Sequence, residues 1–205
     1  MVQSLHRLKE TPSQTAGPYV HIGMTPSFTG LGGVYPEDLG VSMILGDVRG
    51  ERITLRGRIL DGSGAPVRDA VLEIWQADAA GLYNSPSETR GTADPNFTGW
   101  GRQPVDAATG EYVFETIKPG SVPFPDGRRQ APHVSVWILA RGINIGLHTR
   151  IYFSDEAEAN AADPILSRPD FPPDHRATLI GLRQGDTVTR DIVLQGPDET
   201  VFFDI

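Results

Sequence analysis

The chain has 205 residues and a net charge of −8, from 18 Lys and Arg against 26 Asp and Glu. This length suits one domain with a sizeable hydrophobic core. No cluster of basic residues interleaves with aromatic ones, which argues against a nucleic-acid partner, and no apolar stretch approaches the ~20 residues that a membrane helix needs. The absence of cysteine excludes disulfides, thiolate metal sites and a cysteine nucleophile. With no apolar leader at the N-terminus, the chain is predicted to be soluble and cytoplasmic.

Residues 1–50 differ in texture from the rest of the chain. They are rich in proline and glycine and show no sustained apolar period, so they bury little surface by themselves. Such a segment is either disordered or an arm laid against another surface. Regular patterns begin at Glu51, so we expect an N-terminal arm at 1–50 and one folded domain at 51–205.

The domain contains short segments whose composition and alternation are typical of strands. They are separated by glycine- and proline-rich turn signals, and they are 53–60, 71–78, 111–117, 133–140, 147–153, 177–183 and 187–195. In the third of them, alternation puts Tyr112, Phe114 and Thr116 on one face. Many short strands with turns between them are typical of a sandwich.

Two features near the C-terminus complete the expected fold. Ser154, followed by several acidic residues, predicts an N-cap and one short helix. The apolar segment 200–205 is expected to be docked on the domain. The predicted fold is therefore all-β: a β-sandwich of short strands in mixed topology, with an extended N-terminal arm and one short helix.

The common signatures of nucleotide binding and hydrolysis are missing. There is no GxGxxG and no GxSxG, and the five histidines form no HxH or HExxH pair. Tyr83 follows a strand and offers the hard oxygen donor that suits Fe(III), although a packed loop aromatic fits the position equally well. Arg141 ends an apolar strand beside a glycine, where it is either a binding group or a solvated arginine. A lone histidine in a strand, such as His133, is more often a core residue than a ligand.

Several segments together resemble the intradiol ring-cleavage dioxygenases. The resemblance is carried, in order along the chain, by EIWQADAAGLY (73–83), DPNFTGWGR (94–102), GEYVFETIKPG (110–120), APHVS (131–135), HTRIYFSDEAEAN (148–160) and the C-terminal ETVFFDI. Some members of that family consist of two related sandwich chains, α and β. The segments TPSQTAGPYVHIG (11–23) and ARGINI (140–145) resemble the α type.

The resemblance implies an incomplete metal site in this chain. The catalytic β type holds a non-haem ferric ion, Fe(3+), with two tyrosines and two histidines. Here Tyr83 and His133 match two of those four positions, whereas Val122 and Ser135 stand at the other two. Ferric iron needs several strong donors, and neither a valine nor a neutral serine hydroxyl replaces a phenolate or an imidazole. The four positions are therefore expected to be a vestigial site without metal, and no catalytic residue is expected in this chain alone.

The same resemblance implies a homologous β subunit as partner, in a hetero-oligomer of α–β pairs, with the iron bound by β. The arm at 1–50 would pack on that partner. Thr15, Gly17, Pro18 and Arg141 would line the substrate pocket over the partner's iron. The expected reaction is intradiol cleavage of 3,4-dihydroxybenzoate, a small aromatic acid, with O2 to give 3-carboxy-cis,cis-muconate.

Two other functions remain open at this stage. The segment from Ile53 to Trp75 is also similar to transthyretin-like modules, which use a strand–turn–strand unit for packing alone, so a non-catalytic binding or scaffold sandwich is the main alternative. A self-sufficient dioxygenase is the third hypothesis, and Val122 and Ser135 argue against it.

Overall fold

The computed structural model describes residues 14–17 and 19–204. Strands make up most of the regular structure, and the described helices are short. The strands are β1 (Arg52–Leu60), β2 (Val71–Trp75), β3 (Trp100–Pro104), β4 (Glu111–Ile117), β5 (Val122–Pro123), β6 (Arg129–Gln130), β7 (His133–Leu139), β8 (Leu147–Phe153), β9 (Ile180–Gln184), β10 (Thr187–Thr189) and β11 (Ile192–Val193). The helices are α1 (Val20–Met24), α2 (Ala157–Ala162) and α3 (Pro173–Ala177).

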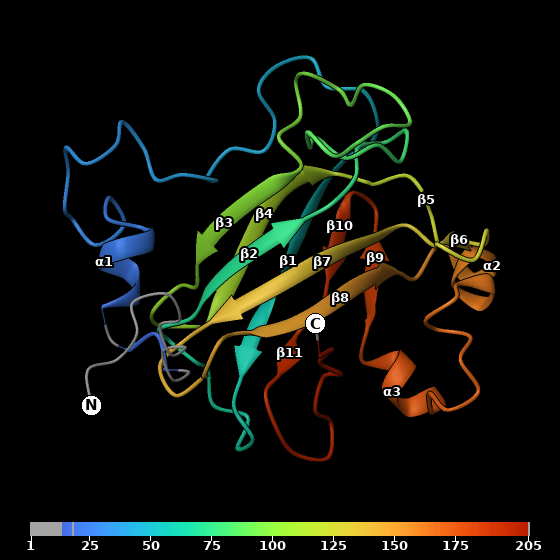
Figure 1. Ribbon diagram of the computed structural model, residues 1–205. Coiled ribbons are helices and arrows are strands. Elements are labelled where there is room, and N and C mark those ends of the chain that lie inside the picture. The colour runs from blue at the N-terminus through green and yellow to red at the C-terminus, as the bar shows by residue number, and fades with distance from the viewer. Residues whose placement is uncertain (1–13, 18, 205) are drawn as a thin grey trace, which may run out of the picture.

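The strands form two packed layers (Figure 1). One layer has the order β3-β2-β7-β8-β9, and the other consists of β4 and β1 with β10 and β11 beside β1. The antiparallel pair β9–β10 joins the two layers. Both kinds of pairing occur, since β1 runs parallel to β10 and β11 and β8 runs parallel to β9, while the other pairs are antiparallel. The predicted β-sandwich of mixed topology is confirmed.

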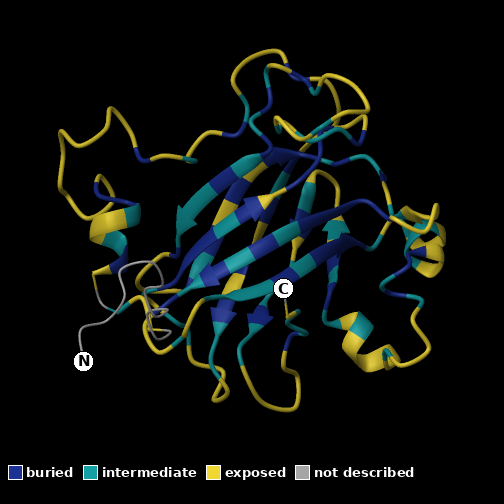
Figure 2. Ribbon diagram, in the orientation of Figure 1, coloured by how far each residue is buried: buried dark blue, intermediate teal, exposed yellow. Residues whose placement is uncertain are grey.

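The hydrophobic core lies between the two layers. Alternate residues of each strand point into it, as the period of two requires: Leu55 on β1, Phe114 on β4 and Val136 on β7 are all at most 1% exposed. Tyr112 and Thr116 are buried with Phe114, so the predicted inward face of β4 is correct. Figure 2 shows buried strand centres with exposure concentrated in the connections. On β7 the remaining residues point to the outer face of their sheet, where the candidate site lies.

The helices differ from the prediction of a single one. Helix α2 occupies the expected segment, but its N-cap is Glu156 and not Ser154. The Ser154 hydroxyl instead accepts a hydrogen bond from the backbone N–H of Arg183, at 2.9 Å, because the chain is still passing along β9 at that point. Helices α1 and α3 were not expected. None of the helices in the described part of the chain is long and apolar enough to cross a membrane.

The arm, as far as it is described, lies against its own chain. The carbonyls of Gly40 and Met43 accept hydrogen bonds from Arg102 and Thr98, at 2.8 and 2.9 Å, which attaches the arm to the region of β3. The Met43 side chain is 1% exposed and belongs to the core. The segment 200–204 is docked as predicted.

Candidate functional site

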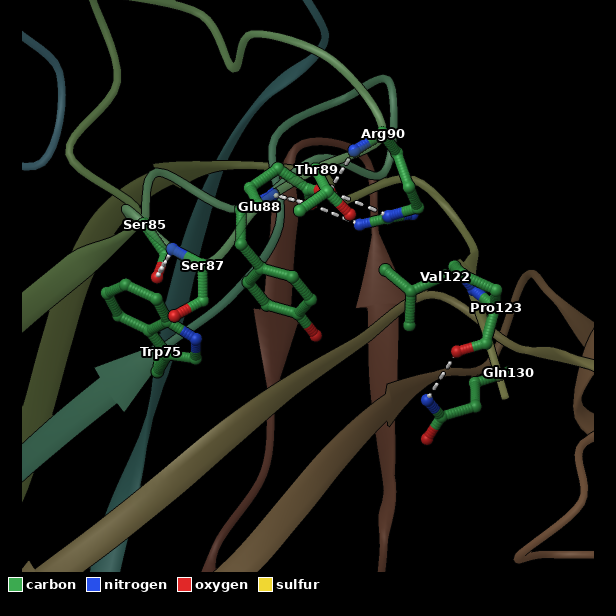
Figure 3. Close-up of a pocket in the computed structure, with 10 residues that line it drawn as sticks. Trp75, Ser85, Ser87, Glu88, Thr89, Arg90, Val122, Pro123 and Gln130 are labelled. Carbon is green, nitrogen blue, oxygen red and sulfur yellow. Dashed lines mark hydrogen bonds and ion pairs between the residues drawn. The ribbon is translucent and has the colours of Figure 1, made fainter. Parts of the chain in front are cut away.

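Tyr83 and Val122 face one cavity at the end of the β2–β7 sheet. The cavity has a volume of about 420 Å³, and Trp75 and Gln130 also line it (Figure 3). The Tyr83 ring stacks on the Trp75 indole with ring centroids 5.9 Å apart and planes 2° from parallel. The cavity therefore places a phenol opposite the valine that occupies the position of a second tyrosine.

The other two positions of the predicted vestigial site, His133 and Ser135, lie on the outer face of β7. Ser135 pairs with Trp75 on β2 and with Arg150 on β8. It borders a second, more apolar cavity of about 260 Å³, which Trp75 also lines. Trp75 thus lies between the two cavities, and the four positions gather at one end of one sheet face.

His133 is held in a defined tautomer by a chain of contacts. Its Nδ1 lies 2.8 Å from the carbonyl oxygen of Ala131, and because a carbonyl only accepts, Nδ1 carries the proton. The Ala131 N–H in turn donates to the buried carboxylate of Asp163 at 2.8 Å. Such contacts orient histidine ligands in metal sites. His133 therefore keeps a ligand-like orientation with Nε2 as its acceptor.

Charged groups border this site. Glu88 and Arg90 line the cavity beside Tyr83 and pair with each other, and the Tyr152 hydroxyl lies 3.4 Å from both the buried Asp163 carboxylate and Arg150. Burial, together with the Arg150 charge, lowers the pKa of His133 from 6.5 to about 4. Burial raises the pKa of Tyr83, with Arg150 acting in the opposite direction. Burial also raises the pKa of Tyr152 above its ordinary value, while the Arg150 charge acts to lower it. At neutral pH His133 and the two phenols are therefore neutral.

These residues do not fit a ferric ion. Only one phenol and one imidazole stand at the four positions, Val122 has no donor atom, and Ser135 offers a neutral hydroxyl. Across residues 14–17 and 19–204, no group of three or more His, Cys, Asp or Glu residues is placed to hold a metal ion.

The predicted substrate-pocket residues lie at the opposite end of β7. The Thr15 hydroxyl accepts a hydrogen bond from the Gly142 N–H at 2.7 Å and donates to the Ala140 carbonyl at 3.3 Å. The arm thereby joins the loop that carries Arg141. Gly17 has a φ of +70°, a conformation that glycine adopts without strain. Pro18 lies outside the described residues.

The distance between the two sets follows from strand geometry. His133 begins β7, and Arg141 lies two residues beyond its end. A strand rises about 3.3 Å per residue, so the two sets are separated by at least ~20 Å. The structure therefore brings Thr15 together with the Arg141 loop, but it keeps both away from Tyr83 and His133.

Sequence reasoning missed three residues of these regions. Asp69 pairs with Arg141, with its carboxylate 3.1 Å from the guanidinium Nε. Gln130 and Arg150 belong to the vestigial site and are hydrogen-bonded at 2.7 Å. Alternation in the segment 147–153 could have indicated Arg150, because it shares the outer face with His148 and Tyr152.

Known proteins similar to this chain agree with the fold. The family model described as Dioxygenase matches residues 24–196. The protocatechuate 3,4-dioxygenase alpha chain of Pseudomonas putida is 45% identical over 201 residues, covering 96% of this chain and 97% of that one. The protocatechuate 3,4-dioxygenase beta chain of Burkholderia cepacia is 38% identical over 167 residues, covering 76% of this chain and 69% of that one.

Among solved structures, the dioxygenase domain of a dioxygenase–carbohydrate-binding protein fusion from Streptomyces sp. SirexAA-E superposes with a TM-score of 0.56 and 25% identity. The match covers 92% of this chain and 99% of that domain. This superposition agrees with the sequence matches and with the sandwich that carries Tyr83 and His133. The chain belongs to the intradiol ring-cleavage dioxygenase family.

Proposed function

We propose that this chain is the α subunit of a protocatechuate 3,4-dioxygenase, in which a homologous β subunit binds the ferric ion. The complex cleaves 3,4-dihydroxybenzoate between its hydroxyl-bearing carbons and incorporates both atoms of O2, giving 3-carboxy-cis,cis-muconate. The observation that carries the proposal is the donor set at the vestigial site. This chain keeps one phenol and one imidazole at the four positions but has Val122 and Ser135 at the other two. An enzyme that contains it therefore needs another subunit to bind the iron.

The two ends of β7 support a division of labour between related subunits. A β subunit of the same fold has its metal site at the end that corresponds to His133. If α and β pack through their outer faces in opposite directions, the Arg141 end of α meets the metal end of β. In that arrangement each site is built from two strand ends, one from each chain. The separation of at least ~20 Å between the two ends of β7 is consistent with it.

Arg141 supplies the local positive charge that this pocket requires. The chain as a whole carries a net charge of −8, so its long-range field repels an anionic aromatic acid. The Arg141 side chain is 65% exposed, and its guanidinium retains donors beyond the Nε that faces Asp69. In the complex, those donors reach toward the substrate or toward the charge that develops on it.

Separate and joint purification tests the proposal. The full chain is produced alone and together with a candidate β subunit, and iron content, the visible tyrosinate-to-Fe(III) absorption band and O2 uptake with 3,4-dihydroxybenzoate are measured. We expect colour and iron in the complex, none in this chain alone, and activity only when both subunits are present. Stoichiometric iron in the lone chain would contradict the proposal.

The β subunit alone is the control that separates the competing functions. A non-catalytic scaffold predicts that β turns over substrate at the same rate with or without this chain. The α-subunit proposal predicts a large loss when this chain is omitted, because the arm and the Arg141 loop complete the pocket.

A further inference from the structure

Arg150 lies beside the vestigial site. It lies on β8 directly opposite Ser135. Its Nη1 lies 2.7 Å from the amide oxygen of Gln130 and 3.4 Å from the Tyr152 hydroxyl. Its charge also influences the ionisation of Tyr83 and His133, so the guanidinium lies within electrostatic reach of both retained donor positions.

No carboxylate pairs directly with Arg150 within residues 14–17 and 19–204. The ion pairs of that part of the chain do not include Arg150. Its two hydrogen-bond partners are a neutral amide and a neutral phenol. The guanidinium is half-buried and lies over the Phe203 ring, with its central carbon 5.9 Å from the ring centroid. The guanidinium therefore has no carboxylate in direct contact, and the buried Asp163 carboxylate is linked to it only through the Tyr152 hydroxyl.

We infer that Arg150 actively opposes metal binding in this chain, because its guanidinium keeps a fixed positive charge beside the four donor positions. The loss of two donors weakens a metal site, whereas a fixed cation among the remaining donors opposes metal binding even when donors are present. Two positive charges a few ångströms apart repel strongly where water is limited. Arginine remains protonated in proteins, so the repulsion cannot be relieved by loss of a proton.

This inference deepens the proposed assignment of iron to the partner subunit and rests on it for the identity of the four donor positions. It does not depend on the aromatic acid that the complex cleaves. Restoring the donors and changing Arg150 separately distinguishes the effect of charge from the effect of missing ligands.

The experiment uses the full chain with both donors restored, as the Val122→Tyr/Ser135→His double variant. The cavity of about 420 Å³ beside Val122 has room for the added phenol. A third substitution is then added: Arg150→Gln, which removes the charge; Arg150→Lys, which keeps it; or Arg141→Gln, which removes a charge at the far end of β7. Each variant is titrated with Fe(III) citrate, and bound iron and the visible tyrosinate-to-Fe(III) band are measured.

We expect one Fe(III) per chain and the visible band only in the triple variant with Arg150→Gln. The double variant and the triple variants with Arg150→Lys or Arg141→Gln should bind iron more weakly by on the order of a hundredfold or more. Equal iron binding with and without Arg150 would overturn the inference, and so would a folded Arg150→Gln triple variant that binds no iron. Circular dichroism and thermal melting identify which variants are folded. If the double variant does not fold, each substitution is repeated in the complex with β, and iron is counted above that of the wild-type complex.

Iron bound by the unmodified lone chain would contradict the proposed function itself. The two failures are therefore distinguishable, since one concerns the natural chain and the other concerns only the variants with restored donors.

Discussion

Arg141 and Asp69 form an ion pair at the end of the molecule that carries the proposed pocket. The Asp69 carboxylate lies 3.1 Å from the Arg141 Nε, and the arginine side chain is largely exposed while the aspartate is mostly covered. An exposed pair contributes little to stability, because water screens it. Its value is therefore orientation: the Asp69 charge attracts the Nε edge of the guanidinium and leaves its other donors free for a ligand.

Replacement of Arg141 by alanine tests its role in the pocket. We expect the complex of this variant with β to show a kcat/KM lower by roughly ten- to several-hundred-fold, since a preorganised cation in a water-poor site contributes about 2–4 kcal/mol. Steady-state kinetics with 3,4-dihydroxybenzoate measures the change, and iron analysis is the control. The iron content should equal that of the wild-type complex. Unchanged turnover would mean that Arg141 is a solvated strand-end residue.

Burial of His133 makes the stability of the chain depend on pH. Its pKa is about 4 in the folded chain, against an ordinary value of 6.5. Between these pH values the unfolded chain therefore binds more protons than the folded chain, and a fall in pH shifts the equilibrium toward unfolding. The contribution of neutral His133 to the free energy of unfolding is complete above about pH 6.5 and is lost as the pH falls toward about 4, with a total of about 3 kcal/mol. His133→Gln keeps a donor for the Ala131 carbonyl and removes the titration. Urea unfolding of both proteins across this range should show a shallower dependence in the variant, and parallel curves would refute the assignment.

Single residues were predicted unevenly from the sequence. Tyr83, Val122, His133 and Ser135 could be named because motifs place them at matching positions, and the structure gathers them at one end of a sheet face. Arg150 could not be weighted in the same way, since its importance depends on its register opposite Ser135. Register is a property of two paired strands and is not visible in either strand alone.

At the scale of elements, β1 depends on a glycine where its pairing changes. The strand pairs with β10 at Thr54–Arg56 and with β11 at Ile59–Leu60, and Gly57 lies between the two. A Cβ atom at Gly57 would lie 1.8 Å from the Arg190 carbonyl oxygen. That oxygen also accepts a hydrogen bond from the Tyr112 hydroxyl at 2.6 Å, so it has little freedom to move.

Gly57→Ala should therefore lower the free energy of unfolding by about 3 kcal/mol, because the backbone must shift to relieve the overlap. Chemical unfolding followed by circular dichroism measures the loss. Gly23→Ala is the matched control, since a Cβ atom there meets no atom within 4 Å. We expect that variant to change stability by less than about 1 kcal/mol. Similar values for the two variants would show that the contact at Gly57 is easily accommodated.

Strands with strong alternation of apolar and polar residues were predictable from the sequence, whereas strands that form only because a neighbouring strand pairs with them were not. The predicted segments 111–117 and 147–153 match β4 and β8 to the residue. Strand β3 was missed because WGRQP lacks apolar alternation, and it is a strand only because it pairs with β2 and supports the arm. The segment 187–195 was predicted as one strand, but the chain leaves β10 and resumes as β11 where its pairing along β1 is interrupted.

At the scale of the whole molecule, apolar exposure is concentrated on the arm. Nine of the thirteen exposed large apolar side chains in the described residues lie between positions 19 and 45. Scattered apolar residues are normal on a protein surface, whereas a concentration in one segment marks an interaction site. The arm is attached to β3 through backbone contacts, so it presents these side chains on a fixed support. This distribution favours a partner subunit that covers the arm.

Charge placed on the arm should therefore weaken assembly with β. Leu45, with 63% of its surface exposed, serves as the test position. Burial of a leucine contributes about 1.5–3 kcal/mol, so Leu45→Glu should raise the Kd of the α–β pair by roughly ten- to a hundredfold or more, measured by calorimetry or sedimentation. Leu182→Glu is the matched control, because Leu182 is 56% exposed on β9, away from the arm. If both substitutions weaken the pair equally, or neither does, the partner covers a different surface, and the exposed apolar side chains of the arm require another explanation.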